Sequence, residues 1–285
     1  MKTVKGLHEK MGTFENANTS FHQAARCKRY TNEVLAFSMV KEEELLRATE
    51  EIQNLTYRQG EYKIFKVFEP KERLIMALPF YDRVVQHMIC NAIQPVFENG
   101  FYYHSYACRS GKGMHAASDT LYQWMYETEV KQGLRMYAFK GDISKYFASI
   151  PHDKLKDENR RYIGDKKALM LMDDIIDHNG ILPDGVGIPV GNLTSQLFAN
   201  VYGNKLDKFC KHVLHIPYFV RYMDDFIILS DDLEQLKEWV KRIEEFLENE
   251  MLLHINPKST ILYAGNGIDF CGYIHYADHK KGGKK

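Results

Sequence analysis

The sequence predicts an α+β fold in which helices cover one face of an antiparallel sheet. The first observation is a pair of β-rich runs within residues 217–230, joined by the acids Asp224 and Asp225, which is typical of a tight hairpin. The second is a separate β-like run at 136–142. The third is an amphipathic stripe at 233–247, with apolar residues at helical spacing. With a helix predicted between the first strand and the hairpin, and short strands after the stripe, the order is that of a split βαβ unit.

Length and composition are those of a soluble globular protein. The 285 residues suffice for one large domain or two subdomains. We find neither an apolar run of membrane-spanning length nor an apolar signal core after the N-terminus, so no membrane association is expected. The five cysteines are scattered and lack metal-ligand spacing, which favours reduced, mostly buried thiols in a cytoplasmic protein. The zero net charge argues against nucleic-acid binding unless local basic clusters supply the contacts.

The N-terminal part is expected to be largely helical, with one basic hairpin. The expected elements are helices over residues 1–65 with a break at 16–20, a hairpin from the runs 62–69 and 74–78, a helix over 81–97, a loop rich in small and basic residues at 105–113 and a helix over 114–126.

The C-terminal part is expected to carry the main sheet. The expected elements are a strand at 136–142, helices around 151–175 and 192–212, the hairpin, a helix over 233–247 and short strands at 251–255, 259–263 and 268–275. We expect Ser230 or Asp231 to cap the helix after the hairpin, and the pair Asp231-Asp232 to serve only in capping. The basic tail at 279–285 is expected to be disordered.

Carboxylates from adjacent strands form the predicted catalytic centre. Asp142 ends the first strand, and Asp224 lies at the tip of the hairpin. Such acids can hold a pair of Mg²⁺ ions for in-line phosphoryl transfer, with Mn²⁺ able to substitute. Asp225 is a further catalytic and metal-binding candidate, although side chains alternate along a strand, so Asp224 and Asp225 cannot both point fully at one ion. The backbone carbonyl of Ile143 is a further candidate ligand. The alternative, a merely polar turn, would favour Gly or Asn at these positions.

Other candidates each have a structural alternative. Phe147, five residues after Asp142, would exclude a ribose 2′-hydroxyl, or would be an ordinary core aromatic. Lys71 and Arg73 are candidates for binding a triphosphate, or form a solvated hairpin tip. Lys258 would protonate a pyrophosphate leaving group, or is a surface lysine.

Basic side chains before the main sheet are candidates for template contacts. Arg109 and Lys112, with the flanking glycines Gly111 and Gly113, would bind backbone phosphates of a template strand. Arg83 is assigned to the same role. A lone Gly-Lys-Gly sequence is common, so spacing alone says little here.

The motifs taken in chain order resemble those of bacterial reverse transcriptases of the group II intron lineage, from about residue 60 to 275. The matching segments are Lys-Glu-Arg at 71–73, Tyr-Asp-Arg-Val-Val-Gln-His at 81–87, Ser-Tyr-Ala-Cys-Arg-Ser-Gly-Lys-Gly at 105–113, Gly-Asp-Ile-Ser-Lys-Tyr-Phe at 141–147, Tyr-Met-Asp-Asp at 222–225, Asn-Pro-Lys at 256–258 and Phe-Cys-Gly-Tyr at 270–273.

The resemblance implies an RNA-directed DNA polymerase with a right-hand architecture. Residues 1–135 would form the fingers, 136–265 the palm with the catalytic acids, and 266–285 the primer grip and a basic tail. Its substrates would be dNTPs, a template RNA and the nascent cDNA. A helical thumb would normally follow the primer grip, so either the sequence is truncated, the thumb is minimal or a partner covers the duplex.

One segment narrows the resemblance. Val190 and Gly191, followed by Ser195 and Gln196, depart from the Gln-Gly and Ser-Pro of retroviral and intron enzymes and resemble the reverse transcriptases of diversity-generating retroelements. Val190 and Gly191 would then lie beside the incoming nucleotide. Those enzymes make frequent errors opposite adenine and work with a small basic accessory protein. A structured RNA is the alternative partner.

Two other functions are compatible with these motifs. An antiphage defence reverse transcriptase working with a noncoding RNA would share every catalytic motif. A catalytically idle RNA-binding scaffold is the alternative outside the enzymes, and the intact set of acids argues against it.

Overall fold

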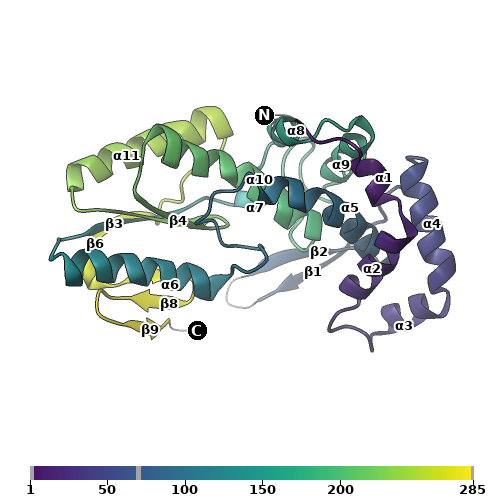
Figure 1. Cartoon of the computed structure of the whole chain (residues 1–285), viewed down its shortest axis with the longest axis horizontal. Coiled ribbons are helices and arrows are strands. Elements are labelled where there is room, and N and C mark those ends of the chain that lie inside the picture. The colour runs from purple at the N-terminus through teal and green to yellow at the C-terminus, as the bar shows by residue number, and fades with distance from the viewer. Residues whose placement is uncertain (1–2, 69–71, 284–285) are drawn as a thin grey trace. The chain divides into compact units, whose positions relative to one another are not determined.

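The computed structural model describes residues 3–68 and 72–283, apart from the side chain of Arg73. The chain divides into two compact units, each built from two separate segments (Figure 1). The first unit comprises Met1–Gly100 and Ile150–Val201, and the second comprises Phe101–Ser149 and Tyr202–Lys285. The division into fingers, palm and primer grip at consecutive boundaries stays a prediction.

The first unit is mainly helical. Its helices are α1 (Leu7–Met11), α2 (Phe14–Ala24), α3 (Asn32–Met39), α4 (Lys41–Gln53), α5 (Phe80–Glu98), α8 (His152–Tyr162), α9 (Lys166–Asp177) and the first part of α10 (Leu193–Lys208). Aromatic side chains join α2, α3 and α5, since the ring of Phe80 lies edge-on to those of Phe21 and Phe37. The expected N-terminal helices are confirmed.

The expected break at residues 16–20 is wrong, because α2 runs through it. Thr13 caps the helix by accepting a hydrogen bond from the Asn16 backbone N–H at 3.2 Å. The Asn16 side chain donates to the Met88 carbonyl on α5 at 2.8 Å. The polar residues that suggested a break therefore serve packing between helices.

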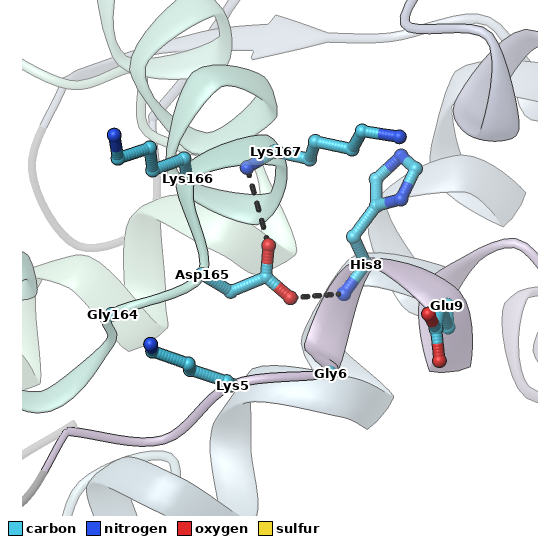
Figure 2. A pocket seen from close by; sticks show the side chains of 8 residues that line it. All are labelled: Lys5, Gly6, His8, Glu9, Gly164, Asp165, Lys166 and Lys167. Atoms are coloured by element: carbon cyan, nitrogen blue, oxygen red, sulfur yellow. Dashed lines mark hydrogen bonds between the residues drawn. The ribbon is translucent and has the colours of Figure 1, made fainter.

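The helix expected around 151–175 is two helices, separated at Asp165. One carboxylate oxygen of Asp165 accepts from the N–H groups of Lys167 and Ala168 at the start of α9, each at 3.2 Å. The other oxygen accepts from the N–H groups of Leu7 and His8, so one side chain caps α9 and α1 together (Figure 2). These backbone hydrogen bonds lower the pKa of Asp165 although burial opposes them.

The basic hairpin of the first unit is confirmed as β1 (Lys63–Val67) and β2 (Arg73–Ala77). The two strands are antiparallel, with Lys63 opposite Ala77 and Val67 opposite Arg73. Lys71 lies outside the described residues. All five residues of β1 are exposed, so this hairpin has no covered face along its first strand.

The second unit contains the main antiparallel sheet, in the order β4-β5-β3-β6. Its strands are β3 (Tyr137–Asp142), β4 (Tyr218–Tyr222), β5 (Asp225–Ser230) and β6 (Thr260–Tyr263). Helix α11 (Leu233–Phe246) covers one face, while α6 (Met114–Met125) lies on the other with strand β8 (Tyr273–His275) (Figure 1). The α+β class is therefore confirmed, and the sheet is covered on both sides.

The burial pattern of β5 agrees with a sheet that is covered on both faces. Every residue of β5 after Asp225 is buried, because its side chains alternate between two packed layers. Ile227 and Leu229 belong to a core cluster with Leu121 and Met125 of α6. A continuous apolar strand of this kind is typical of a sheet buried on both faces.

Helix ends in the second unit differ in part from expectation. Asp232, rather than Ser230 or Asp231, caps α11 by accepting from the N–H groups of Glu234 and Gln235. Ser230 instead accepts from the N–H of Asp232 at 3.1 Å.

The π-helical turns η1 (Tyr126–Lys131), η2 (Phe209–Val213) and η3 (Leu247–Met251) end α6, α10 and α11. The short helix α7 (Tyr146–Ser149) follows β3.

The segment after η3 also differs. Residues 251–255 do not form the expected strand, and only an isolated bridge between Ile143 and Ile255 occurs there. The short 3₁₀ turn η4 (Ala264–Asn266) comes next. The run 268–275 then forms two strands, β7 (Ile268–Phe270) and β8, which are joined by Cys271 and Gly272.

The tail was expected to be disordered, which is wrong for Lys280–Gly282, since these residues form β9 against β8. Lys280 is fixed by an ion pair with Asp119 and lies over the ring of Tyr273. These contacts stabilise the pairing of the basic strand β9 with β8.

All five cysteines are free, as expected, but only Cys90 and Cys210 are buried. Cys27 and Cys108 are exposed and Cys271 is partly exposed, so the expectation of mostly buried thiols is wrong. Of the helices in the described ranges, none combines the length and apolarity that a membrane span requires.

Candidate active site

The tip of the β4–β5 hairpin is a strained two-residue turn. Tyr222 pairs with Asp225, which leaves Met223 and Asp224 as the turn. Met223 has φ of +59°, a left-handed conformation that costs free energy for a residue with a side chain. Glycine would adopt this conformation at lower cost. The turn thus presents the Asp224 carboxylate from a backbone conformation that its surroundings must hold in place.

The register of the sheet brings the predicted acids together. Asp142, the last residue of β3, lies opposite Asp225, the first residue of β5. The Ile143 N–H donates to the backbone carbonyl of Asp224 at 3.3 Å, which ties the end of β3 to the turn. Asp142, Asp224 and Asp225 therefore lie at the same end of neighbouring strands, as the sequence predicted.

The electrostatics of these acids show how crowded they are. Burial raises the pKa of Asp225 to about 7, and the charges of Asp224 and Asp142 and a hydrogen bond to Asp142 add to the rise. Lys140 opposes it. Carboxylates that hinder one another's ionisation in this way form a site where a cation would be stabilised.

The donor chemistry fits Mg²⁺, which prefers carboxylate, carbonyl and water oxygens. The raised pKa of Asp225 is the observation that supports the fit. Within the described ranges, no three His, Cys, Asp or Glu side chains are already arranged to hold an ion jointly. The number of ions and the part played by the Ile143 carbonyl stay predictions.

A loop after η3 holds Asp142 from the other side. Asn256 donates its side-chain amide to Asp142 Oδ2 at 2.6 Å and its backbone N–H to the Asp142 carbonyl at 2.8 Å. Ser259 Oγ accepts from the Asp142 N–H at 3.0 Å. Sequence reasoning selected Asn-Pro-Lys for its lysine and missed Asn256 and Ser259. Lys258 itself is exposed, and its N–H donates to Asn256 Oδ1 at 3.1 Å.

The aromatic pair after Asp142 divides into a core residue and a half-buried one. Tyr146 is 2% exposed and fills the core. Phe147 is only half-buried, with its ring edge-on to that of Tyr146 at 5.9 Å between centroids. Tyr146 is the core aromatic of the pair, and both the sugar gate and the packing alternative for Phe147 stay predictions.

Candidates in the first unit occupy the basic hairpin and the segments beside it. The Val190 carbonyl accepts from the Met76 N–H of β2 at 3.1 Å, so Val190 is fixed to the hairpin. A Cβ on Gly191 would lie 3.0 Å from the Met76 carbonyl, and its φ of +123° also favours glycine. Packing and backbone conformation therefore already explain why a glycine occupies position 191. The nucleotide contacts of Val190, Gly191 and Arg73 stay predictions.

The template candidates are engaged within the protein. Arg83 pairs with Glu33, and its guanidinium lies over the ring of Phe80. In the second unit, Arg109 donates to the carbonyls of Tyr102 and Ser105 at 2.8 and 2.7 Å. Lys112 donates to the Tyr103 carbonyl and lies over its ring. Arg109 and Lys112 stabilise their own loop, whereas Arg83 links α5 to α3. Template contact stays a prediction for Arg83, Arg109 and Lys112.

Comparison with known proteins assigns the family. The family model described as reverse transcriptase (RNA-dependent DNA polymerase) matches residues 66–275, which is most of the chain. This chain belongs to the reverse transcriptase family. The match begins inside β1 and includes β2, the β4–β5 hairpin and all three acids of the candidate site.

Relatives and solved structures agree with this family. Protein YkfC of Escherichia coli is 25% identical over 238 residues, covering 67% of this chain and 60% of that protein. The putative COX1/OXI3 intron 2 protein of Saccharomyces cerevisiae is 22% identical over 254 residues, covering 67% of this chain and 29% of that protein. The chain thus spans 60% or less of these relatives' length. The predicted similarity to intron-encoded proteins is confirmed for the reverse transcriptase domain.

The fold is also that of a solved polymerase. Telomerase from Candida albicans, solved with a fragment of telomeric RNA, superposes with a TM-score of 0.58 over 81% of this chain and 48% of that chain, at 12% identity. This likeness supports the predicted fingers-and-palm fold.

Proposed function

We propose that this chain is the polymerase part of an RNA-directed DNA polymerase that adds dNTPs to a primer 3′-hydroxyl. The observation that carries the proposal is the register that sets Asp142 opposite Asp225 next to the strained turn of Asp224. The substrates would be a template RNA, the nascent cDNA and dNTPs.

The residues of the site have separate roles in this proposal. Two divalent cations, when bound, supply the charge stabilisation that an in-line displacement requires. Asp142 and Asp224 would hold them, with Asp225 and the backbone carbonyl of Ile143 as further candidate ligands. The primer 3′-oxygen forms the new bond to the α-phosphate, and the pyrophosphate leaves. Lys258 has an exposed ammonium that can give a proton to the leaving group. Catalysis would come mainly from positioning and electrostatics.

The direct test is primer extension on an RNA template with dNTPs and Mg²⁺. Asp142→Asn and Asp224→Asn should each lower the rate by at least about 10³-fold, because each removes a metal ligand. Lys258→Ala should retain part of the activity. Near-normal extension by either folded aspartate variant would overturn the assignment, and no extension by the wild type would favour an RNA-binding scaffold.

For the biological role, we propose the error-prone enzyme of a diversity-generating retroelement. Support comes from Val190-Gly191 with Ser195-Gln196, which resembles that group. A basic accessory protein or a structured RNA would be its partner. Sequencing cDNA copied from a template with all four bases should give errors concentrated opposite adenine. An even error spectrum, with a noncoding RNA gene beside the coding sequence, would favour an antiphage defence enzyme instead.

A further inference from the structure

Arg221 is the largest fully buried side chain of the protein's described residues and lies two residues before the strained turn. Its Nε and one terminal nitrogen donate to the two carboxylate oxygens of Asp207, on α10, at 2.6 and 2.7 Å. Arg221 and Asp207 side chains are 1% and 0% exposed. This two-pronged geometry is the strongest form of the arginine–carboxylate pair.

The remaining donors of Arg221 reach the catalytic turn. Its second terminal nitrogen donates to the backbone carbonyl of Met223 at 2.8 Å, and a further N–H donates to Ser105 Oγ at 3.0 Å. The Met223 carbonyl belongs to the left-handed residue immediately before Asp224. A single guanidinium therefore joins α10, the loop at Ser105 and the turn that carries a candidate ligand.

The space around the guanidinium is shaped for it. A Cβ on Gly203 of α10 would lie 2.6 Å from Arg221 and 2.9 Å from the hydroxyl of Tyr146, so only glycine leaves room for both. Tyr146 follows Asp142 by four residues and is buried. The pocket of Arg221 is thus lined by the chain segments that bear Asp142 and Asp224.

Stability alone does not explain this arrangement. A buried ion pair is weak evidence for stability, because desolvation of both charges offsets their attraction, and well-packed apolar residues often do as well. A non-glycine residue held in the left-handed region persists only where its surroundings fix it. The hydrogen bond from Arg221 to the Met223 carbonyl is such a constraint.

We propose that the Arg221–Asp207 pair is a positioning device that holds the turn in its left-handed conformation and so aims Asp224 at the cation site. The inference rests on the proposed catalytic function of Asp224. Arg221 touches neither substrate nor reacting atoms in this account, and it acts through the backbone of Met223.

The test is the double variant Asp207→Leu with Arg221→Met, which removes both buried charges together. We expect a folded protein whose kcat for primer extension is lower on the order of 100-fold, since small misplacement of a catalytic group has effects of this size. The Mg²⁺ concentration for half-maximal rate should rise, with KM for dNTP within a few-fold. A folded double variant with wild-type kcat and Mg²⁺ dependence would overturn the proposal.

A conservative variant keeps the proposal testable if the double variant does not fold. Arg221→Lys keeps the charge but cannot span Asp207 and the Met223 carbonyl at once. It should show the same changes to a smaller degree, and a folded, fully active variant with unchanged Mg²⁺ dependence would contradict the proposal.

Two controls separate the possible failures. Tyr57→Phe removes a buried hydroxyl that donates to Asp82 at 2.7 Å in the first unit, and it should leave the Mg²⁺ dependence unchanged. Asp224→Asn run in parallel tests the underlying function. If Asp224→Asn stays active, the catalytic assignment itself fails. If it is inactive and the double variant is normal, only the positioning inference fails.

Discussion

The β1–β2 and β4–β5 hairpins of this protein differ in how far their strands are buried. Both are short antiparallel pairs, but every residue of β1 is exposed, whereas β5 is buried at every position after Asp225. The β1 strand presents Ile64 and Phe65 to solvent between lysines. The β4–β5 hairpin is enclosed by packed layers, and Arg221 of its own strand β4 is fully buried. The packed surroundings of the β4–β5 hairpin can maintain a strained turn, and this hairpin carries two of the candidate acids.

The difference between the hairpins should be largest in stability. Phe226 of β5 is fully buried, and its ring fills the space where Gly141 lacks a side chain. Phe226→Ala should cost about 3–5 kcal/mol of unfolding free energy, because it leaves a cavity in the core. The matched change Phe65→Ala in β1 should cost less than about 1 kcal/mol. Equal losses in urea unfolding would show that the exposed hairpin is packed in solution.

The half-buried aromatic beside the acids should control the choice of sugar. Phe147→Val and Phe147→Ala should raise incorporation of rNTP relative to dNTP by about 10-fold, equivalent to about 1.4 kcal/mol, since a smaller side chain admits a 2′-hydroxyl. Competition assays with matched rNTP and dNTP measure the ratio. An unchanged ratio with activity retained would make Phe147 a packing residue.

A substitution at Val190, in the segment joined to the exposed hairpin, should have the smallest effect, and the effect should be on copying errors. Valine lacks the donor and acceptor of glutamine, so Val190→Gln adds polar contacts to the region proposed to meet the nucleotide. Misincorporation opposite template adenine should fall several-fold, corresponding to roughly 1 kcal/mol. Sequencing of cDNA from wild type and variant on one template measures the change. Matching error spectra would leave Val190 with its structural hydrogen bond to Met76 alone.

The sequence predicts the elements whose signal is local. The apolar run of β5 and the amphipathic stripe of α11 indicate their structures without knowledge of the fold, and the acids at the strand ends follow from them. Arg221 could not be recognised, because a basic residue in a β-rich run is usually exposed, and nothing local shows that it pairs with Asp207 on the preceding helix α10. The capping role of Asp165 could not be recognised either, because half of its hydrogen bonds go to residues of α1, near the start of the chain.

The central claim is that mutually repelling carboxylates form a cation site. The folded-state pKa of Asp225 is raised above its ordinary value to about 7, so the folded protein binds more protons than the unfolded chain at intermediate pH. The metal-free protein should therefore lose stability as pH rises from about 4 to 7, with the full penalty present above pH 7.

Thermal unfolding of wild type and Asp225→Asn at pH 8, in EDTA and in Mg²⁺, tests the claim most directly. In EDTA the variant should be more stable by about 1–2 kcal/mol, a Tm higher by a few degrees, because it removes one of the crowded charges. Mg²⁺ should raise the Tm of the wild type and narrow the gap. A variant that melts below the wild type in EDTA, with no response of the wild type to Mg²⁺, would contradict the account.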